Sequence, residues 1–534
     1  MPYAALLSAE SRESFGICLK DAVIIVDEAH NLLEAVNSAH AADLARRDLE
    51  AAEQQLSRYQ ERYRSRLGPG NLCNLDTLLS AVRRLDAFLE TFSTGTDPAR
   101  VWGVNEFLFD CGLDNVNLFQ LLAYARKSKI AYKVSAFAEA TAEEGGFEGK
   151  ESAASTDARS SALQSLFSFL ASLTNADSDG RIIAERSEVG SSPEQTVGAS
   201  RLKFALLNAA RHFSEVLTEA RSVVLASGTL APVESLVQQL FPAEDPARIV
   251  RFSCGHVVDP SRLLALPLGV GPSGDPLNFR HGIRSQSSVI DQVGLLLKNL
   301  VRLVPGGTVV FFPSFGYLDE VTARLETTGL LDTIQRERPV FKEPRSAAEV
   351  DSVLALYAAA CGVDPKAGLA RCRGAVLFSV VGGKLSEGIN FGDNLGRCVV
   401  MVGMPYPNPR DPELRERMAQ LDAAAAQAGG GGTAVDGRSY YEDLCMKAVN
   451  QCIGRVIRHT EDYAAVILLD QRYAAAASGG TLGGPLRKLP EWMKPSVAIG
   501  VSNRGFGCVL REVKRFFHKW SGSVAQVSSQ PDHL

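Results

Sequence analysis

The chain contains 534 residues, of which 46% are hydrophobic and 22% are charged, and its formal net charge is −5 at pH 7. This composition is that of an ordinary globular protein with about three domains, and it excludes a largely disordered chain. The acidic balance excludes a generally basic surface, so any contact with nucleic acid must come from local clusters of Lys and Arg.

The first predicted strand is Val23–Val26, four β-branched residues whose pattern predicts a strand buried on both faces. It ends in the sequence DEAH at 27–30, which places carboxylates where open α/β sheets bind ligands. Asp27 is suited to hold a metal–nucleotide complex, and Glu28 to position an attacking water. A strand that ends in a solvated polar turn is the alternative that so short a motif leaves open.

Helical periodicity dominates the next part of the chain. The predicted helices begin near Asp43 and after the Gly68-Pro69-Gly70 break, and further ones cover 115–138 and 159–173. Segments 140–161 and 185–200 are rich in Gly, Ser and Glu, which predicts mobile loops. Residues 32–203 are therefore expected to form a mainly helical insertion.

Strand character returns at 222–226, SVVLA, where the sheet that carries Asp27 is expected to resume with SGTL at its end. Strands and helices then alternate from about residue 260, which predicts parallel strands with helical crossovers. The predicted strands lie in 263–270, 307–314, 374–383, 397–407 and 464–471, and the helices in 285–303, 316–328 and 438–457. The Ala/Gly-rich stretch 423–437 is predicted to be a flexible surface loop.

The sequence contains no phosphate-binding loop of the form G-x-x-x-x-G-K-[ST]. Gly383-Lys384 is followed by Leu385, and Gly149-Lys150 lies in a low-complexity segment. The sequence GVGPSG at 269–274 matches a dinucleotide fingerprint, but the Asp275-Pro276 that follows cannot readily open the helix that would bind a pyrophosphate. We therefore predict that 269–274 is a loop.

Two arginines near the end of the predicted helix 438–457 form a second candidate site. Arg455 and Arg458 are three residues apart, so they are expected on one helical face, with Gly454 allowing close approach and Gln451 one turn back. Such a pair can stabilise a transferring phosphoryl group from a facing domain, an effect of about three to five powers of ten in rate. A solvated pair of arginines is the alternative.

The segment 382–391, GGKLSEGINF, follows a predicted buried strand. Its glycines would let backbone N–H groups face a phosphate, and Ser386, Glu387 and Asn390 offer side-chain partners. A tight structural turn explains the same residues equally well.

Cysteines and apolar runs indicate the class of protein. The ten cysteines include no C-x-x-C pair, which disfavours a zinc site or a disulfide framework and predicts reduced, mostly buried thiols. No run approaches the ~20 apolar residues of a membrane span, and the first residues do not form a signal peptide. We therefore expect a cytosolic or nuclear protein without membrane contacts.

The last predicted helix alternates basic and aromatic residues between Arg511 and Trp520. Phe516, Phe517 and Trp520 could stack on bases while the basic residues contact phosphates. The commoner arrangement docks the aromatic rings on the domain and leaves the charges in water.

Six segments together resemble a known family. They are DEAH at 27–30, SGTL at 227–230, VVFFPSFGYL at 309–318, GGKLSEGINF at 382–391, GRCVVMVGMPYPN at 396–408 and QCIGRVIRH at 451–459. Their order is that of the later motifs of superfamily 2, and they resemble the XPD-like iron–sulfur DEAH-box DNA helicases. FSCGHV at 252–257 and LLDQRYA at 468–474 make the resemblance closest to the branch linked to sister-chromatid cohesion and chromosome loss.

The resemblance implies an α/β fold of two RecA-like parallel-sheet domains, the first incomplete, with a mainly helical arch. The implied boundaries are 1–31 and 204–245 for the first domain, 32–203 for the arch, 246–520 for the second domain and 521–534 for a disordered tail. By resemblance, Asp27 binds Mg²⁺, Glu28 polarises the attacking water, and His30, Ser227 and Thr229 couple the nucleotide to DNA. Gln451, Arg455 and Arg458 face the γ-phosphate, and Gly454, Glu387 and Gly388 belong to the cofactor site. Glu387 and Gly388 lie in the loop that links nucleotide and DNA, and Ser386 and Asn390 of the same loop take part in this coupling.

The function implied is that of an ATP-dependent DNA helicase. Family members move 5′ to 3′ on single-stranded DNA and unwind forked duplexes, which implies a nuclear role in cohesion and DNA repair with cohesion or replication proteins as partners. Asn390 stands where many relatives carry Asp. The phosphate-binding loop and the four cysteines of the iron–sulfur cluster have no counterpart here, so we expect an amino-terminally truncated chain that does not hydrolyse ATP alone.

Two alternatives remain after the resemblance is considered. One is a non-enzymatic module that keeps the arch and the second domain as a DNA-binding or partner-binding platform. The other is an RNA helicase of the DEAH class, which the arch-sized insertion between DEAH and SGTL disfavours.

Overall fold

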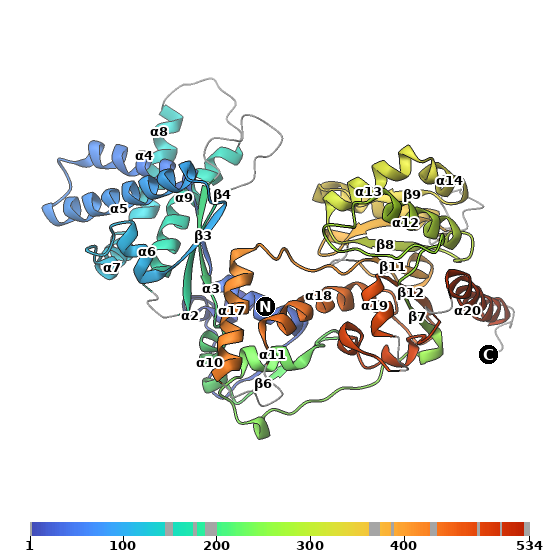
Figure 1. Ribbon diagram of the computed structural model, residues 1–534. Helices are drawn as coiled ribbons and strands as arrows, with labels where there is room; N and C mark the ends of the chain where they lie inside the picture. Colours follow the sequence, from blue (N-terminus) through green and yellow to red (C-terminus); the bar gives the residue numbers. More distant parts are fainter. Residues whose placement is uncertain are drawn as a thin grey trace, which may run out of the picture.

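The computed structural model describes residues 3–144, 153–174, 179–186, 200–362, 374–385, 389–427, 435–477, 481–501 and 505–527. The fold is α/β, as predicted, and contains three sheets. In Figure 1 the arch stands on the left and the large sheet of the second domain lies on the right, with a two-stranded sheet and helices α17 and α18 between them.

The first unit comprises the residues on either side of the arch. Its elements are α1 (Tyr3–Leu7), α2 (Ala9–Phe15), β1 (Val23–Val26), α3 (Leu32–His40), α10 (Ala209–Glu219), β6 (Ser222–Leu225) and α11 (Val233–Leu240). Strands β1 and β6 are parallel, with Val23 opposite Ser222 and Val26 opposite Leu225. The DEAH and SGTL segments therefore leave neighbouring strands at the same edge, as the sequence predicted.

The prediction that β1 is buried on both faces is wrong. Val23 and Ile25 are 55% and 71% exposed, whereas Val26 is buried in a core with Leu32 and Phe213. The reason is that the described sheet has only two strands here, and helices of the first unit cover one of its faces.

The arch contains more than helices. Its helices are α4 (Arg46–Tyr63), α5 (Pro69–Thr94), α6 (Val104–Asp110), α7 (Leu118–Ser128), α8 (Ile130–Glu144) and α9 (Ala153–Ser172). An antiparallel sheet in the order β2-β5-β4-β3 joins them, formed by β2 (Ala42–Ala45), β3 (Ala99–Gly103), β4 (Gly180–Arg186) and β5 (Ser200–Leu206). The helical patterns were predicted, and the sheet was missed because its strands are short and far apart in the sequence.

The ends of the arch also differ from the expected 32–203. Helix α3 packs Leu32 and Val36 into the first unit, and β5 continues to Leu206, so the arch spans 42–206. Helices α8 and α9 extend into the predicted loop 140–161, and β4 and β5 reach into the predicted loop 185–200. The central parts of both loops, 145–152 and 187–199, lie outside the described residues.

The second domain is a six-stranded, wholly parallel sheet in the order β7-β12-β11-β8-β10-β9. Its strands are β7 (Leu263–Leu268), β8 (Thr308–Phe312), β9 (Val340–Lys342), β10 (Val376–Val380), β11 (Cys398–Val402) and β12 (Ala464–Leu469). Its helices are α12 (Ser287–Leu300), α13 (Phe315–Thr327), α14 (Leu330–Glu337), α15 (Val350–Ala360), α18 (Gly437–Ile453), α19 (Gln471–Ala476) and α20 (Phe506–Val527). Separate apolar cores cover the two faces of the sheet. No helix begins at Asp275, so 269–274 is a loop, as predicted.

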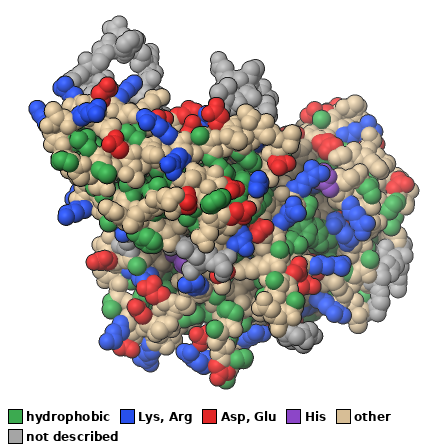
Figure 2. Space-filling model, turned by 60° about the vertical axis from the view of Figure 1, so that its left-hand side comes forward, with side chains coloured by type: hydrophobic (Ala, Val, Ile, Leu, Met, Phe, Trp, Pro, Cys, Tyr) green, Lys and Arg blue, Asp and Glu red, His purple; other side chains and the backbone are tan. Residues whose placement is uncertain are grey.

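Helix α17 (Pro412–Gln427) leaves the second domain and contacts the arch. Glu413 Oε2 lies 2.7 Å from Lys203 Nζ, and Glu416 Oε2 lies 2.9 Å from Arg181 Nε, so two ion pairs join the helix to the arch. This helix occupies the start of the predicted flexible loop 423–437, of which residues 428–434 lie outside the described part. In Figure 2, Lys and Arg side chains gather around the hollow between the arch and the right-hand lobe.

Helix α20 decides between the two alternatives for its aromatic residues. Phe516 and Phe517 are buried in the core of the second domain, while Arg511 and Lys514 are exposed, so the rings dock rather than stack on bases. The helix continues to Val527, past the predicted start of a disordered tail at 521, and residues 528–534 lie outside the described part. Among the described helices, none is both long and apolar enough to span a membrane.

Candidate functional site

The acidic site lies in the turn after β1. Asp27 and Glu28 are both exposed, and Glu28 has a φ of 50°, which non-glycine residues rarely adopt. The Tyr3 hydroxyl donates hydrogen bonds to the backbone oxygens of Asp27 and Glu28, and the Glu28 N–H donates to Asp27 Oδ1 at 2.9 Å. These bonds hold a left-handed turn that keeps both carboxylates accessible at the end of the strand.

His30 joins this turn to the SGTL segment. His30 Nδ1 lies 2.9 Å from Ser227 Oγ and 3.1 Å from Glu28 Oε2, and the Ser227 hydroxyl donates to Glu28 Oε2 at 3.2 Å. Burial lowers the pKa of His30, and Lys447 and Arg455 lower it further, although Glu28 opposes them. The imidazole is therefore largely neutral at pH 7. Two motifs separated by almost 200 residues thus share one hydrogen-bonded group.

The end of α18 faces this group from the second domain. A Cβ atom placed on Gly454 would lie 3.1 Å from Thr229 Cγ2, so the two domains touch at this point. Asn450 Nδ2 also donates to the backbone oxygens of Ala231 at 3.4 Å and Lys488 at 2.9 Å. Gly454 therefore permits the close approach that the sequence predicted, and the contact is to the first unit.

Arg455 and Arg458 lie after the helix rather than on it. Helix α18 ends at Ile453, not 457, and the Phe391 N–H donates to the Arg455 backbone oxygen at 2.9 Å, which draws the chain away from the helical path. Burial and the nearby Arg455 lower the pKa of Arg458, whereas Glu28 raises it. The charge of Glu28 therefore acts on Arg458, and the charge of Arg455 acts on His30. The acidic turn and the arginines thus face each other across one interdomain cleft.

The two arginines have no carboxylate partner among the described residues. Neither forms an ion pair within the part of the chain that the structure describes, and Arg455 Nε is buried without a hydrogen-bond partner there. Arg455 Nη1 donates to the Ile389 backbone oxygen at 3.5 Å, and Arg458 Nη2 donates to Asn390 Oδ1. The amide of Asn390 therefore serves as an acceptor, and positive charge remains available for an anion. Ser386, Glu387 and Gly388 lie outside the described residues.

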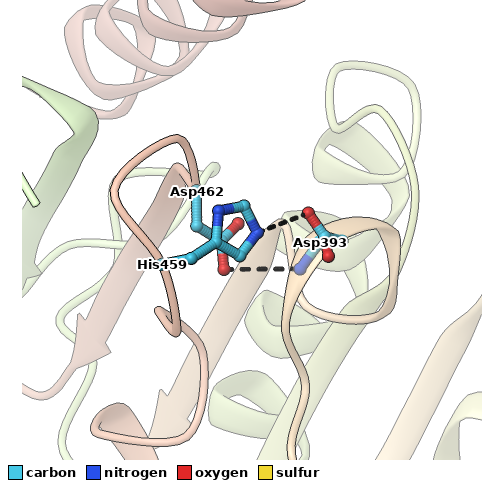
Figure 3. A group of neighbouring side chains, drawn as sticks. All are labelled: Asp393, His459 and Asp462. Atoms are coloured by element: carbon cyan, nitrogen blue, oxygen red, sulfur yellow. Dashed lines mark hydrogen bonds and ion pairs between the residues drawn. The ribbon is translucent and has the colours of Figure 1, made fainter.

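Asp462 lies beside Asp393 and His459 (Figure 3), and its Oδ2 accepts a hydrogen bond from the Arg458 backbone N–H at 3.3 Å. Asp393, His459 and Asp462 are spaced like metal ligands, and theirs is the one such group among the described residues. However, Asp462 is 1% exposed and already binds Arg397 Nη1 at 2.7 Å. Its oxygens also accept the N–H groups of Asp393, Arg458 and Tyr463. Asp462 therefore fixes the backbone of Arg458, and its own carboxylate is already occupied by these hydrogen bonds.

The free charges of the cleft fit a magnesium nucleotide. Asp27 forms no ion pair with a described cation, and the arginines opposite lack a described anion, so a metal–phosphate complex supplies what both sides need. An iron–sulfur cluster does not fit the residues present. The nine described cysteines are free, and no group of three among them is spaced for a metal.

Comparison with known proteins identifies the family. Residues 1–49 match the DEAD_2 family model, and residues 297–495 match the helicase C-terminal domain model. The chain is 31% identical to the ATP-dependent DNA helicase chl1 of Aspergillus clavatus, over 97% of this chain and 69% of that protein. The chain belongs to the CHL1/DDX11 branch of the XPD-like DEAH helicases.

Further comparisons define the extent of this CHL1/DDX11-type chain. It is 39% identical to the ATP-dependent DNA helicase DDX11 of Danio rerio over 97% of its own length, and it spans 60% of that relative. Its fold matches the structure of S. tokodaii Xpd4 with a TM-score of 0.50 and 19% identity, covering 86% of this chain and 73% of the other. This match shows that the fold is shared, and the relatives and the two family models confirm the family resemblance.

The CHL1/DDX11-type chain brings most of the predicted site residues together. Asp27, Glu28, His30, Ser227 and Thr229 lie on one side of the cleft, and Asn390, Gln451, Gly454, Arg455 and Arg458 belong to the other. Sequence reasoning missed Tyr3 and Asp462, which belong to none of the six motifs. The only signal for Asp462 was its position two residues before a buried strand.

Proposed function

We propose that this chain forms the DEAH and arginine sides of the ATP site of a DNA helicase. Asp27 would hold Mg²⁺, Glu28 would orient the attacking water, and Arg455 and Arg458 would contact the γ-phosphate, with Gln451 beside them. Bound Mg²⁺ would neutralise charge on the phosphates. The observation that carries this proposal is that Arg455 and Arg458 form no ion pair with a described carboxylate and lie close enough to His30 and Glu28 for their charges to interact.

Coupling to DNA would run through the contacts between the domains. His30, Ser227 and Thr229 link the acidic turn to Gly454. A movement of one domain relative to the other would therefore shift the residues on both sides of this contact. By resemblance to the family, we propose that the protein moves 5′ to 3′ on single-stranded DNA and unwinds forked duplexes. The same resemblance is the basis for proposing a nuclear role in chromosome cohesion and genome maintenance, with cohesion or replication proteins as partners.

The test requires a phosphate-binding loop, a motif that these 534 residues do not contain. A segment that carries a phosphate-binding loop of the form G-x-x-x-x-G-K-[ST], taken from a DNA helicase of this family, would be fused ahead of this chain. We expect DNA-stimulated ATP hydrolysis, and we expect Glu28→Gln to abolish hydrolysis while DNA binding persists, because Glu28 acts on the water and not on the nucleic acid.

Two outcomes would favour the alternatives. DNA binding without hydrolysis in the fused protein would support the non-enzymatic binding module. Faster unwinding of RNA than of DNA duplexes of the same sequence would support the RNA helicase. Glu349→Gln, an exposed carboxylate of the second domain, is the matched control and should leave hydrolysis unchanged.

A further inference from the structure

Glu343 is a buried carboxylate that the proposed chemistry does not use. It follows β9 and is only 3% exposed. Its Oε2 accepts hydrogen bonds from the Ser379 hydroxyl at 2.7 Å and the Val380 N–H at 2.8 Å, and its Oε1 accepts the Leu385 N–H at 3.0 Å. No described Lys or Arg forms an ion pair with it. A buried anion is costly without such bonds, so its position is tightly fixed.

The loop after β10 is shaped around this carboxylate. A Cβ atom on Gly383 would lie 2.4 Å from Glu343 Oε1 and 2.9 Å from its Cδ, so only glycine fits there. Gly382 has a φ of 72°, which also favours glycine. The sequence left open whether these glycines cradle a phosphate or form a structural turn. In the described part of the loop, the side chain of Glu343 holds the amides that a phosphate would need.

The other end of the same loop reaches the arginine site. Ile389 and Asn390 accept hydrogen bonds from Arg455 and Arg458, and the Phe391 N–H donates to the Arg455 backbone oxygen at 2.9 Å. Leu385 and Phe391 are fully buried, so each anchors one end of the loop in the domain core. The described residues at the start of the loop are therefore held by Glu343, and the described residues at its end contact the two arginines.

We propose that Glu343 is a positioning residue for the ATP site. It fixes the start of the loop whose end brings Asn390 into contact with Arg458. This inference rests on the proposed function. Glu343 acts through the loop and touches neither arginine in the contacts described, so its loss should misplace the arginine contact without removing a nucleotide ligand. A displacement of ~1 Å at a reacting centre can lower a rate by about 100-fold.

The first experiment measures ATP hydrolysis by the fused protein with Glu343→Gln. The substituted side chain has one acceptor oxygen for the three donors that now bind Glu343. Its NH₂ group would also face one of these donors, so the start of the loop loses its anchor. We expect kcat at saturating single-stranded DNA to fall between about 10-fold and 100-fold, with KM for ATP changed less than about threefold. Ser379→Ala removes one bond and keeps the carboxylate, so its effect should be smaller.

The second experiment follows amide hydrogen exchange in the 534-residue chain itself. Glu343→Gln should speed exchange at Val380 and Leu385, whereas the middle of β11 should stay protected. Glu349→Gln, an exposed neighbour, should change neither measurement.

The outcomes separate this inference from the function on which it rests. If the unsubstituted fused protein hydrolyses no ATP, the proposed function fails and the positioning role fails with it. If that protein is active but Glu343→Gln lowers only thermal stability, with kcat and KM unchanged, Glu343 is structural and the inference is overturned. Unchanged exchange at Val380 and Leu385 would also overturn it.

Discussion

The two parallel sheets of this molecule are built from similar strands but have different surroundings. In β1 and β6, Val23, Ile25 and Val224 are 55%, 71% and 47% exposed. In β8, β10, β11 and β12 every residue is buried. Both groups of strands are rich in β-branched residues, so the difference does not arise from local sequence. It arises because a strand is buried only by neighbouring strands and covering helices.

This difference divides the candidate site into two unequal halves. The arginine half stands on the six-stranded sheet and is braced by Asp462 and, as proposed, by Glu343. The acidic half stands on two described strands and depends on Tyr3 and on the contact between Thr229 and Gly454. We therefore expect the arginine half to be preformed and the acidic half to depend more on its neighbours.

The largest expected effect comes from the arginine half. Arg458→Ala in the fused protein should lower kcat for ATP hydrolysis by about 10³ to 10⁵, because the charge opposite Glu28 is lost. Steady-state kinetics with single-stranded DNA would measure this loss. Arg302→Ala, which removes only an exposed ion pair with Glu337, is the control. A loss of less than about tenfold would mean that Arg458 does not contact the reacting phosphate.

A matched pair of isoleucines tests the comparison of the sheets directly. Ile467 of β12 is fully buried, whereas Ile25 of β1 is 71% exposed. Ile467→Ala should lower the free energy of unfolding by about 2–5 kcal/mol and Ile25→Ala by no more than about 0.5 kcal/mol. Urea unfolding, monitored by hydrogen exchange of the amides in each strand, would measure the two losses in free energy of unfolding. Equal losses would show that the two strands are equally buried in solution.

Acid should weaken the first unit through His40. Burial and the adjacent His212, whose ring centroid is 4.1 Å away, lower the pKa of His40 to about 4. As the pH falls from about 6.5 to 4, unfolded His40 binds a proton that folded His40 resists, so stability is lost over that window. Hydrogen exchange of α3 against pH would measure the loss. His40→Phe should remove part of the slope, and an unchanged slope would contradict this assignment.

The smallest effect is expected where α17 meets the arch. Arg181 and Glu416 are partly exposed, so Arg181→Ala should cost about 0.2–1 kcal/mol, and less at high salt. Protection of β4 amides at low and high ionic strength would detect the change. A loss that does not depend on salt would indicate packing rather than an ion pair.

The sequence predicted those features that local pattern and motif order determine. The strands and helices of the second domain, the return of the first sheet at 222–226 and the position of the acidic turn at the end of β1 follow from periodicity and residue type. The exposed face of β1 could not be predicted, because its burial depends on partners outside the strand. The antiparallel sheet of the arch was also missed, since β2 and β5 pair across more than 150 residues.

The details of the arginine site were beyond local reasoning as well. Arg455 leaves the helix because its backbone oxygen binds Phe391, a residue more than 60 positions earlier. Glu343 and Asp462 are single acidic residues in no motif, and only the folded chain places them beside the loop amides and Arg458. Long-range hydrogen bonds of this kind leave no periodic signal in a sequence.

The central claim is that the DEAH turn and the arginine turn face each other across one cleft. Thr229→Cys with Gly454→Cys tests it most directly in the 534-residue chain without the fused segment, since a Cβ atom built on Gly454 would lie 3.1 Å from Thr229 Cγ2. After mild oxidation, peptide mapping should find a disulfide between residues 229 and 454 in most molecules, and none between 229 and the exposed native Cys254. If no 229–454 bond forms, even with a short bifunctional maleimide, the two halves do not meet and the proposed ATP site is contradicted.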